Sequence, residues 1–259
     1  MLGFRLIVFL MFVLNTNVAC SNVTKQMDSS EKRYNVRMSK EVLSNMDLET
    51  MFPDINIRKL AEAAGNGDIK LVNTIVLGGV DVNSRGRRNA TTLFWSMKNE
   101  RGFEALLKLG ADVNIIFDDG GSVLHWAARL SDTTILELAL KHGGNPDLKA
   151  GEFEQTPMFK AISPDLDDGI SKAFTVLLEH RADINVRDKN GNTLLLAAAN
   201  LGRFDIVYFL LQRGADSSAV NIHGYDLSEK IEQKKKLFLP ASERAKWLKK
   251  VEKSLTKGS

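Results

Sequence analysis

The side chains that could perform catalysis or bind a metal are few, and their spacing matches no chemical site. The four histidines stand far apart, at His125, His142, His180 and His223. None has a zinc-ligand spacing to another histidine or to a thiol. No Ser/His/Asp or Cys/His arrangement stands out either. The sequence therefore predicts no catalytic centre, no metal site and no cofactor.

One acidic cluster, Asp165, Asp167 and Asp168 followed by Gly169, superficially resembles a calcium loop. Such a loop needs its glycine and its bidentate glutamate at fixed positions. Here the glycine comes one position early, and Val176 stands where the glutamate should be. A solvated loop is the better interpretation.

The composition favours a folded chain whose partners are not nucleic acids. The chain has 259 residues, 44% of them hydrophobic, which is enough for a sizeable core. Its formal net charge is +3, and no basic run resembles a nucleic-acid-binding arm. Cys20 is the only cysteine, so no intrachain disulfide can form.

The N-terminus has the pattern of an export signal. Arg5 precedes a continuously apolar run, residues 6–14, that is too short to span a membrane. Ala19 and Cys20 then follow, which resembles the cleavage site of bacterial lipoproteins, where the thiol is acylated. We expect a signal peptide at 1–19 and a lipidated tether at 20–45, with the protein in the periplasm on the outer membrane. The alternative is ordinary cleavage near Ala19 and a soluble exported protein.

The rest of the chain is organised around residues 188–218. Thr193 can cap a helix over 194–200, which Gly202 ends because glycine accepts left-handed backbone. A second helix is predicted over 204–213, and Gly214 ends it. A unit of this size cannot bury its own apolar face, so it needs stacked neighbours.

Such neighbours recur along the sequence. The loop after the second helix returns with its last residue at Asn83, Asn114, Asp147, Asn185 and Ser218, in steps of 31, 33, 38 and 33 residues. An insertion near 163–171 accounts for the longest step. This order of turn, helix, glycine, helix and glycine closely resembles the ankyrin repeat. The resemblance implies an all-α ankyrin-repeat solenoid with hairpin loops. We expect about five repeats within 46–219, and a C-terminal capping repeat with a final helix within 220–259.

The ankyrin register indicates which side chains face a partner. By that register, Glu62, Trp95, Trp126, Lys160 and Ala197 point from successive inner helices into the concave groove. Exposed tryptophan is typical of binding surfaces. Lys98 and Arg129 follow the two tryptophans by three residues, so each ring should have a cation beside it. The alternative is that the loops or the N-terminal segment cover the rings.

Charged loop tips extend this surface. They contain Arg87 and Arg88 in repeat two, Asp118 and Asp119 in repeat three, and Phe153 between two glutamates in repeat four. Each tip alone could equally be an ordinary solvated loop. Together with the tryptophans, they predict a mixed-charge interface centred on aromatic rings.

The chain also resembles a functional class of ankyrin proteins. Residues 47–54, 79–83, 92–95, 102–107 and 121–125 resemble the ankyrin-type immunity lipoproteins that accompany phospholipase effectors of type VI secretion systems. That resemblance implies a non-enzymatic immunity protein that binds and neutralises a cognate lipase or phospholipase toxin. Two alternatives stay open: a periplasmic scaffold or stress-protection adaptor, and an enzyme accessory domain with its own ligand pocket.

Overall fold

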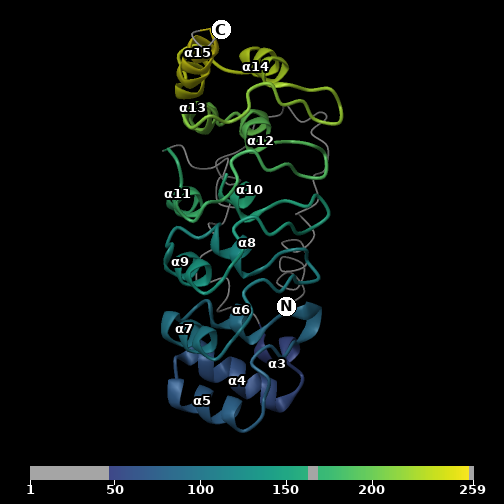
Figure 1. The fold of residues 1–259 in the computed structure, drawn as a ribbon, viewed down its shortest axis with the longest axis vertical. Helices are drawn as coiled ribbons and strands as arrows, with labels where there is room; N and C mark the ends of the chain where they lie inside the picture. The colour runs from purple at the N-terminus through teal and green to yellow at the C-terminus, as the bar shows by residue number, and fades with distance from the viewer. Residues whose placement is uncertain (1–46, 163–168, 257–259) are drawn as a thin grey trace, which may run out of the picture. The chain divides into compact units, whose positions relative to one another are not determined.

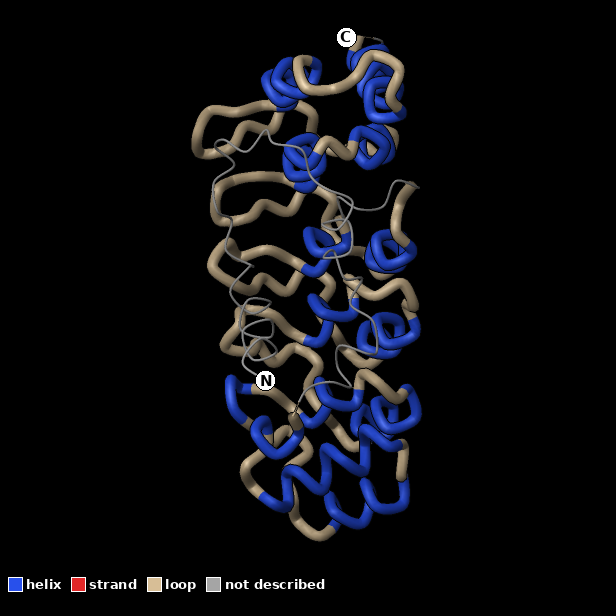
Figure 2. Tube along the Cα trace, turned by 180° about the vertical axis from the view of Figure 1, so that it is seen from behind, coloured by secondary structure: helices blue, strands red, loops and turns tan. Residues whose placement is uncertain are grey.

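The computed structural model describes residues 47–162 and 169–256. Within these ranges the chain consists of helices and loops, and the loops pair only through isolated antiparallel bridges (Figures 1 and 2). The predicted signal peptide, Cys20 and the tether lie outside the described residues, as does most of the insertion at 163–171. No described helix combines the length and the apolar character that a membrane crossing requires.

Five helix pairs follow one another in the described part of the chain. The inner helices are α4 (Ile55–Asn66), α6 (Thr92–Ser96), α8 (Val123–Ala127), α10 (Pro157–Ala161) and α12 (Leu194–Leu201). The outer helices are α5 (Ile69–Leu77), α7 (Glu100–Lys108), α9 (Thr134–Lys141), α11 (Lys172–Glu179) and α13 (Phe204–Leu211). The short α3 (Leu48–Met51) precedes them, and α14 (Leu227–Lys235) and α15 (Glu243–Leu255) follow. The inner helices form one row and the outer helices another, with long loops on the far side of the inner row (Figure 1). The predicted ankyrin-type helical solenoid is thus confirmed.

Local signals in the sequence place the helix ends. The Thr193 hydroxyl accepts from the Leu196 backbone N–H at 3.4 Å, which caps the start of α12. Gly202 ends α12 with a φ of 75°, and Gly214 has a φ of 78° after α13. The two helices of this repeat end within two residues of the predicted positions, as expected for glycine in the left-handed region.

Neighbouring repeats are joined by amide side chains in the recurrent loop. The Asn114 side chain donates to the Gly143 carbonyl at 3.0 Å and accepts from the Asn145 backbone N–H at 2.8 Å. Asn83 makes the same pair of bonds to Gly110 and Asp112, one repeat earlier. The regular spacing of these asparagines therefore reflects a hydrogen bond between successive repeats.

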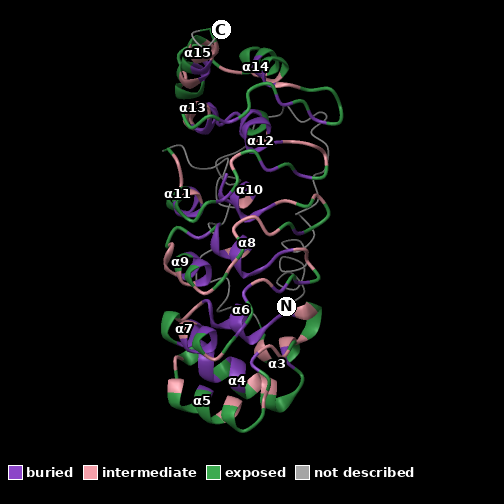
Figure 3. Cartoon of the chain, viewed as in Figure 1, coloured by how far each residue is buried: buried purple, intermediate pink, exposed green. Residues whose placement is uncertain are grey.

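The apolar core runs between the two helix rows. Large side chains such as Phe103, Phe174 and Phe204 are fully buried between them. Buried residues concentrate along the inner helices, whereas α5 and α15 at the two ends have more exposed than buried residues (Figure 3). On the final helix, Ala245, Leu248 and Val251 are buried, so α15 packs through one apolar face.

Candidate protein-binding surface

Trp95 is a core residue, so the prediction that it is a solvent-exposed anchor is wrong. Only 4% of its surface is exposed. Phe52, which directly follows α3, packs edge-on against the indole with 6.2 Å between ring centroids. Gly65 of α4 makes room for the ring, because a Cβ there would lie 2.8 Å from the indole Nε1. The N-terminal segment thus covers Trp95, which was the alternative left open by the sequence.

Lys98 lies beside Trp95, as the spacing of three residues predicted. Its Nζ sits 4.2 Å from the centroid of the indole ring, a cation–π geometry. Burial of the ammonium lowers the pKa of Lys98, and the nearby Glu62 carboxylate acts in the opposite direction. Lys98 therefore packs over the face of the buried ring, and both residues lie at the junction between repeats one and two.

Trp126 keeps an accessible part and forms the centre of the candidate surface. It is half-buried, and Phe94 packs edge-on against it with 5.2 Å between centroids. Gly121 again makes room, because a Cβ there would lie 3.0 Å from the indole Nε1 and 3.3 Å from an Asp119 oxygen. The indole edge and the Asp119 carboxylate thus converge on one spot. Trp126 has the partial exposure that a binding anchor needs.

Two cations from neighbouring repeats join Trp126 and Asp119. Loss of hydration lowers the pKa of the Arg129 guanidinium, although the residue as a whole stays exposed. Desolvation also lowers the pKa of Lys160, and repulsion from Arg129 lowers it further. Asp119 opposes both shifts. We call Asp119, Trp126, Arg129 and Lys160 the inner-face cluster. It presents two partly dehydrated cations beside one carboxylate and one aromatic edge.

His125 and Gln155 are connected to this cluster by hydrogen bonds. The buried imidazole lies 2.8 Å from the Ser122 hydroxyl through Nδ1 and 2.8 Å from the Gln155 carbonyl through Nε2. The Gln155 side chain accepts from the Lys160 Nζ at 3.0 Å. Burial lowers the pKa of His125 to about 4, helped by the charge of Lys160. His125 is therefore a neutral structural residue near pH 7, and it ties repeat three to repeat four.

The predicted loop tips lie at the ends of the loops that precede successive inner helices. Arg87 and Arg88 are exposed in the short helix η2 (Arg87–Asn89). The Arg88 carbonyl accepts from the exposed Asp118 at 3.0 Å, and the carbonyl of the half-buried Phe153 accepts from Lys189 at 2.8 Å. Backbone bonds thus link the tip of repeat two to the tip of repeat three, and the tip of repeat four to the loop of repeat five. Arg87, Arg88 and Asp118 present their charges to solvent.

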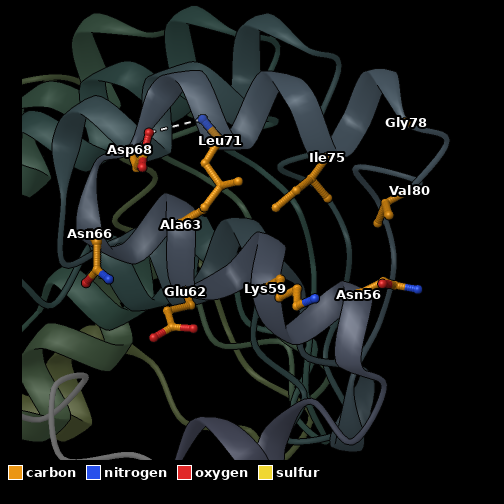
Figure 4. A pocket seen from close by; sticks show the side chains of 10 residues that line it. All are labelled: Asn56, Lys59, Glu62, Ala63, Asn66, Asp68, Leu71, Ile75, Gly78 and Val80. Atoms are coloured by element: carbon orange, nitrogen blue, oxygen red, sulfur yellow. Dashed lines mark hydrogen bonds between the residues drawn. The ribbon is translucent and has the colours of Figure 1, made fainter.

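A separate groove of about 760 Å³ opens on the first repeat (Figure 4). Helices α4 and α5 line it, with Ala63, Leu71 and Ile75 as its apolar side and Lys59 and Glu62 at its polar side. Asp68 at its edge already accepts from the Leu71 backbone N–H at 3.0 Å. The groove marks the uncovered end of the first helix pair. Its lining therefore combines an apolar wall with a polar and charged one.

Sequence reasoning missed two features of the candidate surface. Gln155 was not singled out, although its carbonyl and side chain hold His125 and Lys160 in place. Lys230 stands 33 residues after Ala197, so the repeat register could have extended the inner row to it. Its Nζ lies 4.4 Å from the Tyr225 ring centroid and 3.4 Å from the Asn200 amide oxygen.

Comparison with known proteins matches the repeat geometry. The family model described as ankyrin repeats, in three copies, matches residues 60–150 and 124–221. Protein PhlB of Serratia liquefaciens is 30% identical over 146 residues, which cover 56% of this chain and 62% of PhlB. The putative palmitoyltransferase ZDHHC13 of Danio rerio is 26% identical over 208 residues, covering 66% of this chain and 32% of that protein. The chain thus spans less than two thirds of the length of these relatives.

Two solved structures share the fold. One is a chain of the complex between the predatory endopeptidase Bd0816 of Bdellovibrio bacteriovorus and the immunity protein Bd3460. It aligns with a TM-score of 0.58 and 25% identity over 74% of this chain and 97% of its own length. The ankyrin-repeat protein EF0377 aligns with a TM-score of 0.60 and 26% identity over 78% of this chain and 98% of its own. The family model matches more than half of this chain, so the chain belongs to the ankyrin-repeat family, whose fold is typically a scaffold for protein interactions.

Proposed function

We propose that this protein is an exported immunity protein that binds and neutralises a cognate lipase or phospholipase toxin of a type VI secretion system. The inner-face cluster carries the proposal, because it combines the half-buried ring of Trp126 with the partly dehydrated cations Arg129 and Lys160. A partner segment that bears a carboxylate beside an apolar side chain fits this arrangement. The likeness to a chain of an endopeptidase–immunity protein complex supports the same class of function. Neutralisation would follow from covering the toxin, without catalysis by this chain.

The charged loop tips would widen the interface around that centre. Arg87 and Arg88 lie at the loop tip of repeat two, and Phe153 lies at the loop tip of repeat four. Charges at the rim of an interface mainly steer association, whereas a buried central anchor sets the lifetime of the complex. We therefore expect the two groups of residues to differ in their kinetic effects.

The proposal implies that a lipase-class toxin is encoded beside this protein. The experiment measures binding to that purified toxin, together with inhibition of its lipase activity. Trp126→Ala should weaken binding by about thirtyfold, since removing a central anchor costs about 2 kcal/mol. Arg129→Glu should weaken binding strongly while leaving the fold intact, because the residue is exposed. Lys141→Glu is the matched control: the same charge change in the same repeat, at an exposed position on the outer helix α9.

The result can separate the proposed function from its alternatives. If the adjacent lipase binds and is inhibited, and only the inner-face variants lose this, the proposal holds. If wild-type protein neither binds nor inhibits the lipase, the immunity function is wrong and the scaffold alternative takes its place. If Arg129→Glu binds as tightly as Lys141→Glu, the interface lies outside the inner-face cluster.

We also propose that Cys20 anchors the mature protein to the outer membrane of a bacterial cell. The single cysteine directly follows a small residue and an apolar run, and acylation at that position would hold the chain at the membrane. Cys20→Ala should move the exported protein from the membrane fraction to the soluble periplasmic fraction. A wild-type protein that is already soluble after export would contradict the anchor.

A further inference from the structure

The loop between α14 and α15 presents two leucines to solvent. Leu237 is 70% exposed and Leu239 is 77% exposed. Phe238 between them turns inward, with its ring 5.9 Å from that of the buried Phe204. The Leu239 carbonyl accepts from both the backbone N–H and the hydroxyl of Ser242, at 3.0 and 2.7 Å. The loop is thus held in place, and its two leucines stay outside the core.

A stripe of lysines covers the outer face of α15. Lys246, Lys249, Lys250 and Lys253 stand at helical positions i, i+3, i+4 and i+7, so they share one face. The buried residues Ala245, Leu248 and Val251 occupy the opposite face. All four lysines are exposed (Figure 3 shows the exposed parts of α15).

These lysines are poorly compensated by nearby acids. Glu252 is engaged by Lys235, and Glu243 by Lys246 at 2.5 Å. Within the described part of the chain, no ion pair is formed by Lys249, Lys250 or Lys253. Like charges four residues apart oppose helix stability, so the stripe is unfavourable for α15 by itself.

The positive charge is concentrated at this end of the chain. Residues 227–256 contain nine Lys or Arg and four Glu, a formal charge of +5, whereas the whole chain carries +3. Lys236 is exposed directly before Leu237. The C-terminal cap therefore combines a basic surface with protruding aliphatic side chains.

We infer that the C-terminal cap, α14, α15 and the loop between them, docks on an anionic lipid surface. Lysines near a membrane are attracted to anionic headgroups, and protruding leucines can enter the boundary between headgroups and acyl chains. Protein interfaces favour the opposite composition, because they are depleted in lysine and use aromatic or arginine anchors. This docking depends neither on acylation of Cys20 nor on a toxin partner.

The first test measures sedimentation of the full chain with lipid vesicles. A Cys20→Ser background removes any contribution of a lipid anchor. Phosphatidylcholine vesicles are compared with vesicles that also contain phosphatidylglycerol. We expect binding only to the anionic vesicles, with a loss at high salt. Lys249→Glu with Lys250→Glu should reduce partitioning by more than about twentyfold, at about fivefold for each lysine removed. Lys59→Glu with Lys70→Glu, the same change at two exposed lysines of the first repeat, should have little effect.

The second test asks whether the leucines enter the lipid. Because Cys20 is the only cysteine, Leu239→Cys in the Cys20→Ser background can carry a single environment-sensitive fluorophore. Its emission should shift to the blue on anionic vesicles. Leu77→Cys is the control, because Leu77 is 84% exposed and lies on α5 of the first repeat. No binding to anionic vesicles, equal binding by both charge-reversed variants, or equal shifts at both labels would overturn the inference.

Discussion

Acidification should destabilise the protein through His125. The neutral imidazole can donate from Nε2 to the Gln155 carbonyl and accept at Nδ1 from the Ser122 hydroxyl, at 2.8 Å in each case. A proton on Nδ1 would remove the acceptor and place a second positive charge near Lys160. Burial of the imidazole and the positive charge of Lys160 hold the pKa of His125 at about 4, below its ordinary value of 6.5.

The size and the sign of the effect follow from these two pKa values. Above pH 6.5 the ring is neutral in both the folded and the unfolded chain, so stability is independent of this group. Between pH 6.5 and 4 the unfolded chain binds a proton that the folded chain does not, so stability falls as the pH falls. Between pH 7.5 and 4.5, the linkage relation gives a loss of about 2.5 kcal/mol in the free energy of unfolding.

Urea unfolding of wild type and His125→Gln at both pH values measures this loss. The glutamine does not titrate, and carboxylates that protonate over the same range affect both proteins equally. The difference between the two pH-dependent losses therefore isolates His125. We expect wild type to lose about 2.5 kcal/mol more than the variant. Equal losses in the two proteins would refute the assignment of His125 as a buried neutral group.

Three further predictions concern stability and are checked by chemical or thermal unfolding. Trp95→Ala should cost about 3–5 kcal/mol because it empties a core site, whereas Trp95→Phe should cost much less; a small effect of the alanine would mean that the ring is not packed. Gly202→Val should cost more than Gly214→Val, since both positions have positive φ but a Cβ at Gly202 would also lie 2.9 Å from the Phe238 ring; equal costs would contradict this packing. Asn114→Ala should cost about 1–3 kcal/mol because it breaks two bonds between repeats, and an unchanged midpoint would show that those bonds are dispensable.

Much of the fold could be predicted because its signals are local. Thr193, Gly202 and Gly214 mark helix ends through their own hydroxyl or backbone freedom, and they do so within one repeat. The recurrence of this pattern then predicts stacking, since each helix pair has an apolar face that only a neighbour can cover. The expectation that the chain has no catalytic centre likewise rests on residue types and spacing alone.

The accessibility of a side chain is a different kind of property, and only the tertiary structure decided it. Trp95 and Trp126 occupy the same place in successive repeats, so the register treats them alike. Phe52, which lies 43 residues before Trp95 in the chain, covers the Trp95 ring, whereas the Trp126 ring stays half-exposed. No pattern within a repeat encodes this difference. The inner-face cluster likewise brings Asp119, Arg129 and Lys160 together across two repeats. The repeat pattern sets which way a side chain points, whereas its burial and its charge environment depend on what the rest of the chain places in front of it.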